Sequence, residues 1–131
     1  MNINDIKFTW MVYDLHVAPS ANNQSNVILK TNWTLHAGYS DPISGKFFEE
    51  ELLGTSIFKF DESKPFIPFE NLNQDVVLGW IIEKENTKQR NVAWKYDDMA
   101  KKLEEKVNPK QIILKNPFNI THPTDDSKPV I

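Results

Sequence analysis

The sequence has no cysteine among its 131 residues and no long apolar run. The absence of cysteine excludes disulfides, thiolate metal ligands and a cysteine nucleophile, and it favours a reducing compartment. No stretch approaches the ~20 apolar residues that span a bilayer, and Met1–Asp5 lacks the basic start and apolar run of a signal peptide. We therefore expect a soluble protein with no membrane contact and no secretion signal of its own.

Positive charge is also scarce. The chain carries 15 Lys and Arg against 18 Asp and Glu, which gives a formal net charge of −3. Nucleic-acid binding draws its affinity from clustered, uncompensated cations, so we expect no nucleic-acid partner. A single basic cluster stands out, and the glutamates mixed into it predict a solvated loop. Its members are Lys84, Lys88, Arg90 and Lys95.

Motifs of common enzyme classes are missing as well. There is no G-x-S-x-G, H-E-x-x-H or G-x-G-x-x-G. Ser44-Gly45-Lys46 is not the end of a phosphate-binding loop, because Ser40 stands where the first glycine belongs. We therefore assign no catalytic, cofactor-binding or metal-binding residue, and we expect no cofactor.

What is present is the composition of one globular domain, with 40% hydrophobic and 25% charged residues. Three stretches carry the two-residue period of strands: Ile6–Val17, Val27–Ala37 and Lys46–Phe60. Turn-forming residues predict loops over 18–26 and 38–45. Gly54 could break the third stretch in two, and Gln111–Leu114 could add a further short strand.

Two helices are predicted downstream of the strands. Asn73 is a favoured N-cap for a helix that reaches about Lys84, and 85–91 reads as a polar loop. A second helix, Trp94–Val107, ends at Asn108-Pro109. These elements predict an α+β fold, an antiparallel sheet of three to four strands with two C-terminal helices packed on one face.

In this arrangement the sheet buries Trp33 and Leu35 against a helix that carries Trp80 and Ile81. We expect one domain over residues 1–118. The remaining residues, 119–131, are polar and interrupted by proline, which predicts a flexible tail or an interaction arm that orders only on a partner.

Histidines offer one route to a metal or catalytic site. His16 and His36 would come close if the first two strands paired with their polar faces aligned, and a glutamate from Glu49-Glu50-Glu51 would complete a two-histidine, one-carboxylate set. The spacing does not impose this geometry, and exposed histidines on a solvated face explain the pattern equally simply. His122 lies in the predicted tail.

Aromatic residues offer a second route. The four tryptophans, together with two phenylalanines, could form a stacking platform for bases or sugars. Core packing is the alternative, because several of them lie on apolar faces of predicted elements. The residues are Trp10, Trp33, Trp80, Trp94, Phe66 and Phe69.

A set of turn, cap and packing signatures runs from Asn32 to Phe118. It consists of Trp33-Thr34, Leu53-Gly54-Thr55, Phe66-Ile67-Pro68-Phe69, Asn73 before Val77-Leu78-Gly79-Trp80, Asn108-Pro109 and Pro117-Phe118. In these features the chain resembles a family of small uncharacterised proteins of marine tailed phages, cyanophages especially. It departs from that pattern at Asn73, where Thr is usual, and at Phe118, where Trp is usual.

The resemblance implies a phage setting and no known activity. We therefore expect a non-enzymatic interaction protein, either a minor virion component or a host-directed accessory factor. It would work in the cytoplasm of the infected host cell or in the virion, with a protein partner or by self-association, including as a homo-oligomer. The alternative is a small metal-binding protein or enzyme that uses His16 and His36.

Overall fold

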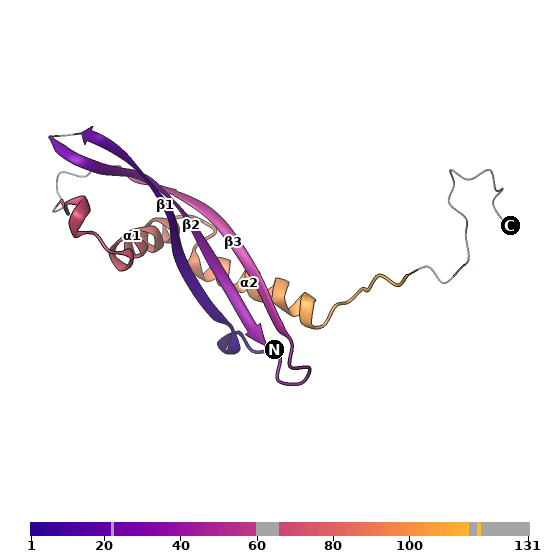
Figure 1. The fold of residues 1–131 in the computed structure, drawn as a ribbon. Helices are drawn as coiled ribbons and strands as arrows, with labels where there is room; N and C mark the ends of the chain where they lie inside the picture. The colour runs from indigo at the N-terminus through magenta and orange to yellow at the C-terminus, as the bar shows by residue number, and fades with distance from the viewer. Residues whose placement is uncertain (22, 60–65, 116–117, 119–131) are drawn as a thin grey trace, which may run out of the picture.

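The computed structural model describes residues 1–21, 23–59, 66–115 and 118. An antiparallel sheet in the order β1-β2-β3 is followed by two helices that lie together on one of its faces (Figure 1). The predicted α+β class is confirmed, with three strands in the described part of the chain. The bounds are β1 (Lys7–Ala21), β2 (Gln24–Ser40), β3 (Phe47–Ile57), α1 (Gln74–Asn86) and α2 (Val92–Val107), with 3-10 turns at Ile3–Asp5 and Phe69–Asn71.

The β1–β2 hairpin is longer than predicted. β1 continues to Ala21 and β2 begins at Gln24, so the loop predicted over 18–26 is wrong. Asn23 has a φ of 62°, a left-handed conformation that asparagine tolerates and that suits a tight hairpin turn. Pro19 does not end β1, because β1 is an edge strand and proline is accepted there.

The central strand β2 supplies much of the core. Trp33, Leu35 and Ala37 are buried, as its alternation predicts. Leu29 has the same two-residue spacing, but its side chain is 46% exposed. The pairing of β1 with β2 shifts at this point, from His16–Lys30 to Val17–Ile28, so Leu29 falls out of register.

β3 runs unbroken through Gly54, contrary to the alternative of two short strands. Gly54 pairs with Trp33, and a Cβ at Gly54 would lie 2.1 Å from Cζ2 of the Trp33 indole. The missing side chain therefore makes room for the tryptophan without ending the strand.

The helices begin with asparagine caps. Oδ1 of Asn73 accepts a hydrogen bond from the backbone N–H of Val76 at 2.9 Å, which confirms the predicted start of α1. α1 continues beyond Lys84, and α2 begins before Trp94 because Asn91 caps it. The predicted loop over 85–91 is therefore too long at both ends.

Both helices bury one side against the sheet. Val77 and Ile81 of α1 and Met99 and Leu103 of α2 join the core. The helix that was predicted to carry Trp80 and Ile81 onto the sheet does so, with Ile81 fully buried. Trp80 packs on the core half-buried and meets Phe58 edge-on, with ring centroids 6.1 Å apart.

The end of the described chain contains no further strand. Residues 111–114, where a short strand was predicted, are exposed and have no regular structure. The predicted tail, 119–131, lies outside the described residues. Among the described residues, no helix combines the length and the apolarity required to cross a bilayer.

Candidate functional site

The sheet has one face that no described helix covers. Inward side chains such as Trp10, Trp33 and Leu52 pack into the core, so the residues that alternate with them point the other way. We call this surface the outer face. Its residues are Lys7, Thr9, Met11, Tyr13, Asp14, His16, Lys30, Asn32, Thr34, His36, Glu49, Glu51, Leu53, Thr55 and Ile57.

Large apolar side chains lie at the middle of the outer face. Met11 of β1 and Leu53 of β3 lie in one row, on either side of Thr34 of β2. The side chains beside and beyond this row are strongly exposed: Tyr13 is 74%, Leu53 72%, Ile57 63% and Met11 54% exposed. A solvated sheet face normally carries polar residues at such positions, so the apolar row is a feature to explain.

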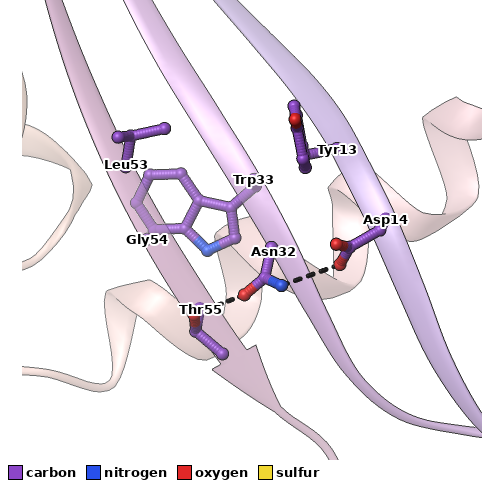
Figure 2. Close-up of a pocket in the computed structure, with 7 residues that line it drawn as sticks. All are labelled: Tyr13, Asp14, Asn32, Trp33, Leu53, Gly54 and Thr55. Atoms are coloured by element: carbon purple, nitrogen blue, oxygen red, sulfur yellow. Dashed lines mark hydrogen bonds between the residues drawn. The ribbon is translucent and has the colours of Figure 1, made fainter.

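A shallow groove of about 310 Å³ opens beside this row. Tyr13 from β1 and Leu53 from β3 flank it, and Asn32 of β2 lies between them (Figure 2). Asp14, Trp33, Gly54 and Thr55 complete its lining. An open groove with apolar sides and a few polar atoms fits a single inserted side chain better than an enclosed small molecule.

A chain of polar contacts crosses the three strands at this groove. The hydroxyl of Thr55 donates to Oδ1 of Asn32 at 2.6 Å, and Nδ2 of Asn32 donates to Oδ1 of Asp14 at 2.8 Å. Nε2 of His16 lies 3.2 Å from the same Asp14 oxygen. Because the Thr55 proton goes to an amide oxygen and not to a base, the chain does not activate a nucleophile.

The two candidate histidines do not converge. His16 is paired with Lys30, and His36 lies six positions further along β2. At ~3.4 Å per residue this separates them by about 20 Å. His36 instead contacts Oε2 of Glu49 through its Nε2 at 3.1 Å. The structure therefore does not bring His16 and His36 together as the alternative of a shared site requires.

The three consecutive glutamates are divided between the two faces of β3. Glu49 meets His36 on the outer face, whereas Glu50 forms an ion pair with Lys106 of α2 at 2.7 Å. Glu51 is exposed beside His36 in the register. Among the described residues, no group of three His, Cys, Asp or Glu side chains could hold a metal ion.

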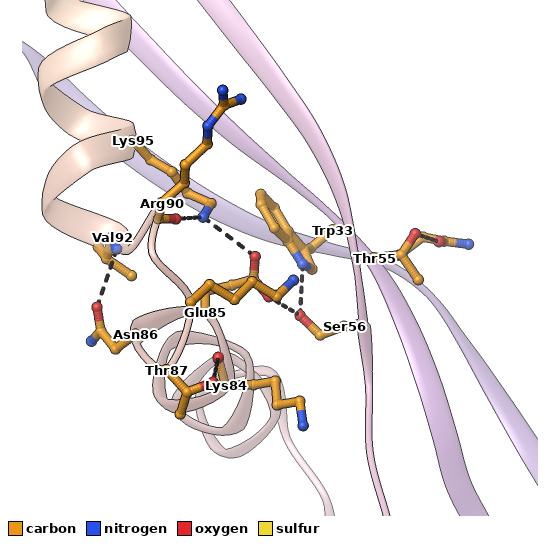
Figure 3. A network of polar contacts seen from close by, with 12 residues as sticks. Trp33, Thr55, Ser56, Lys84, Glu85, Asn86, Thr87, Arg90, Val92 and Lys95 are labelled. Atoms are coloured by element: carbon orange, nitrogen blue, oxygen red, sulfur yellow. Dashed lines mark hydrogen bonds and ion pairs between the residues drawn. The ribbon is translucent and has the colours of Figure 1, made fainter.

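The inner side holds a polar cluster that the sequence did not indicate. Glu85 is 2% exposed, and its Oε1 lies 3.4 Å from Nζ of Lys95 (Figure 3). Its Oε2 accepts a hydrogen bond from the Ser56 hydroxyl at 3.1 Å and lies 2.7 Å from Nζ of Lys88. Nε1 of Trp33 in turn donates to Ser56 Oγ at 2.9 Å.

This cluster corrects the solvated loop predicted around Lys84, Lys88, Arg90 and Lys95. Lys95 is buried, and its ammonium also donates to the backbone carbonyl of Arg90. Buried charges need such partners, so the cluster joins α1, α2 and β3. The polar atoms of the cluster bind one another, so we assign the cluster a structural role.

The aromatic residues are dispersed. Trp10 packs on Trp33 with ring centroids 5.0 Å apart, and its Nε1 donates to the Tyr96 hydroxyl at 2.8 Å. Trp94 lies elsewhere, under the guanidinium of Arg90 at 4.8 Å. The stacking platform is therefore not formed by these tryptophans, and the core-packing alternative holds for Trp10 and Trp33.

Comparison with known proteins identifies a family. The model of a family described as a domain of unknown function (DUF7936) matches residues 5–118, so the chain belongs to this family. No curated protein matches the chain. No solved structure matches it either. The match spans all three strands and both helices, and thus includes the outer face and the inner polar cluster.

Proposed function

We propose that this member of the DUF7936 family is a non-enzymatic interaction protein that binds a protein partner through its outer face. The observation that carries the proposal is the exposure of Met11, Tyr13, Leu53 and Ile57 on a sheet face that no described helix covers. Exposed apolar side chains gathered on one surface favour a protein interface over a solvated face.

The surroundings of these side chains support the same function. Interfaces combine an apolar centre with a polar rim. Here Glu49, Glu51 and Lys30 are exposed beyond the apolar row, and the groove between Tyr13 and Leu53 offers a recess for a partner's side chain. Tyrosine and methionine are enriched at interfaces, because both present large contact area.

The setting we propose is a phage infection, with the protein acting as a minor virion component or a host-directed accessory factor. The support is the resemblance to small proteins of marine tailed phages carried by Asn32–Phe118. The protein would then be found in the host cytoplasm or in the virion. Proteomics of purified virions decides between the two roles, since only a virion component is packaged in constant copy number.

A photo-crosslinking experiment tests the binding surface. A crosslinking amino acid replaces Leu53 on the outer face, or Asp97 on the exposed side of α2 as the matched control. The variants are expressed in the natural host and adducts are identified by mass spectrometry. We expect protein adducts from position 53 and not from position 97. Equal labelling at both positions, or none at position 53, would overturn the proposal.

Metal analysis of the purified protein tests the enzyme or metal-binding alternative. We expect no stoichiometric zinc or iron, because His16 and His36 lie at separate places on β1 and β2. A stoichiometric metal that is lost on substitution of either histidine would favour the enzyme or metal-binding alternative over the interaction function.

A further inference from the structure

We propose that the partner of the outer face is a second copy of this chain, packed face to face with its strands running in the opposite sense. This inference rests on the proposed function, since it names the occupant of the same surface. In the dimer a two-fold axis lies between the sheets and perpendicular to the strands, near the Trp33–Gly54 pair. Each strand then crosses its own copy, and the two ends of the outer face exchange places.

The charges on the outer face are arranged for this exchange. At one end β3 presents Glu49 and Glu51. Towards the other end Lys30 of β2 is exposed, and Lys59 follows two residues after β3. Lys59 is exposed, whereas the residue before it, Phe58, packs on the core. Acidic residues of one copy therefore meet basic residues of the other, and the two-fold axis repeats this contact at both ends of the outer face.

Two charges of the opposite sign moderate this pattern. Lys7 lies opposite Gly38 at the acidic end, and Asp14 lies opposite Asn32 on the other side of the centre. Asp14 is already engaged by Asn32 and His16. The end with Glu49 and Glu51 therefore still differs in the sign of its charge from the end with Lys30 and Lys59. In the alternative packing, with like ends together, the axis runs along β2, so Lys30 would face Lys30 of the other copy, which is repulsive.

The apolar centre is self-complementary under the same axis. A two-fold contact requires that residue i of one copy meet residue j of the other, and j meet i. Rotation about the Trp33–Gly54 row brings the row of Met11 opposite the row of Asp14 and Asn32, beside the unpaired Tyr13 of the register shift, and it brings Leu53 opposite Thr55. The Met11 side chain of each copy then lies at the groove flanked by Tyr13 and Leu53 in the other.

The area is sufficient for a specific contact. β3 contains 11 residues, which makes the face ~37 Å long, and three strands at ~4.8 Å spacing make it ~14 Å wide. Two such faces bury about 1,000 Å² in total, the lower range of specific interfaces. Twisted sheets pack in this way with their strands about 30° apart. We therefore expect a reversible dimer with modest affinity.

A charge-exchange experiment on the full chain tests the proposal. One variant carries Glu49→Lys and Glu51→Lys, and the other carries Lys30→Glu and Lys59→Glu. Sedimentation equilibrium at low ionic strength should show a dimer for the natural chain. Each variant alone should dimerise with a Kd at least about tenfold higher, since like charges then meet at both ends. Mixing the two variants should restore the dimer, because opposite charges meet again at both ends.

The control variant, Asp97→Lys with Glu105→Lys, makes on α2 the same change in net charge as the variant with Glu49→Lys and Glu51→Lys. Both residues are exposed, and the Kd should stay within about twofold of the natural value. Circular dichroism verifies that every variant is folded. At 0.5 M salt the differences between the variants should shrink, because the rim charges are screened.

Several outcomes would overturn the dimer. A monomer at all concentrations, or equal effects of the outer-face and α2 variants, excludes the second copy. So does a mixture that dimerises no better than its components. A different protein crosslinked at position 53, with the purified chain monomeric, would reject this inference and keep the proposed interaction function. A crosslink from position 53 to residues 119–131 of the same molecule would assign the face to the chain's own C-terminal segment.

Discussion

Gly54 and Trp33 fit closely against each other in the core. The indole of Trp33 occupies the space where a side chain at position 54 would lie, and its Nε1–H is satisfied by Ser56 two residues along β3. Gly54 therefore makes room for the tryptophan ring, and Ser56 accepts the hydrogen bond of its Nε1–H. Trp33 links β2, β3 and, through Ser56, the buried Glu85 of α1.

Gly54→Ala should destabilise the fold. Its Cβ would lie 2.1 Å from Cζ2 of Trp33, closer than two carbon atoms can approach, so the ring or β3 must shift. Overpacking of this kind costs about 1–3 kcal/mol in the free energy of unfolding, measured by urea denaturation. Gly79→Ala is the matched control, because a Cβ there meets nothing within 4 Å in the helix α1. It should be neutral or stabilising by up to ~1 kcal/mol. Equal costs for the two variants would contradict this account of Gly54.

Asp41 organises the turn between β2 and β3. The Ser44 hydroxyl donates to its carboxylate at 2.7 Å, and the backbone N–H groups of Ile43 and Ser44 donate at 3.2 and 3.3 Å. These bonds favour the charged form, so they hold the pKa of Asp41 below its ordinary value, with the Ser44 hydroxyl as the largest cause.

The turn should therefore weaken in acid. A carboxyl whose pKa is lowered on folding contributes its full stability above its unfolded pKa of about 3.9, and loses it as pH falls through the folded pKa. The natural chain should be more stable than Asp41→Asn at pH 6, and the difference should shrink below about pH 4. Urea denaturation from pH 6 to pH 2 measures this. A difference that grows in acid would contradict the assignment.

At the scale of elements, the α1–α2 connection depends on buried charge. Glu85 near the end of α1 meets Lys95 in the first turn of α2, and Asn86 Oδ1 accepts a hydrogen bond from the backbone N–H of Val92 at 3.1 Å. The ion pair thus fixes how the two helices meet over β3. Breaking a buried pair leaves a charge without its partner, which costs more than the pair itself contributes.

A double-mutant cycle measures that coupling. Lys95→Met should cost about 2–4 kcal/mol in the free energy of unfolding, because Glu85 stays buried with Ser56 and Lys88 as its remaining partners. Glu85→Met with Lys95→Met should cost less than the sum of the two single changes by about 1–3 kcal/mol. Lys88→Met, whose side chain is half exposed, should cost less than ~1 kcal/mol. Additive single and double changes would show that the pair is not coupled.

Local signals explain which elements could be predicted. The Asn73 cap and the helical pattern of Trp94–Val107 depend on neighbours in sequence, and both agree with the structure, in which Met99 and Leu103 are buried. The burial of Glu85 could not be predicted locally, because the atoms that satisfy it include Ser56, 29 residues away. Pairing across strands also joins residues that are far apart in the sequence. The sequence therefore could not show that the register keeps His16 apart from His36.

At the scale of the whole molecule, the helices complete only one side of the sheet. The buried hydrophobic residues of the described chain extend from Ile6 to Leu103, and they lie between the sheet and the helices or within the hairpin. The outer face contributes little to this core. Under the proposed function, substitutions of its apolar residues should therefore change association before they change the stability of the fold.

Removal of residues 119–131 separates the roles of the fold and the C-terminal segment. The buried residues of the described chain all precede position 104, so a chain ending at Phe118 should unfold within about 0.5 kcal/mol of the full chain. The charges and apolar residues of the proposed dimer lie between positions 11 and 59, so its Kd should stay within about twofold. Light scattering and urea denaturation measure both quantities.

A truncated chain that is stable but monomeric would show that residues 119–131 are an interaction arm, and dimerisation would then depend on the arm and not on the outer face alone. A truncated chain that loses several kcal/mol of stability would place these residues within the folded unit, contrary to a domain that ends at 118.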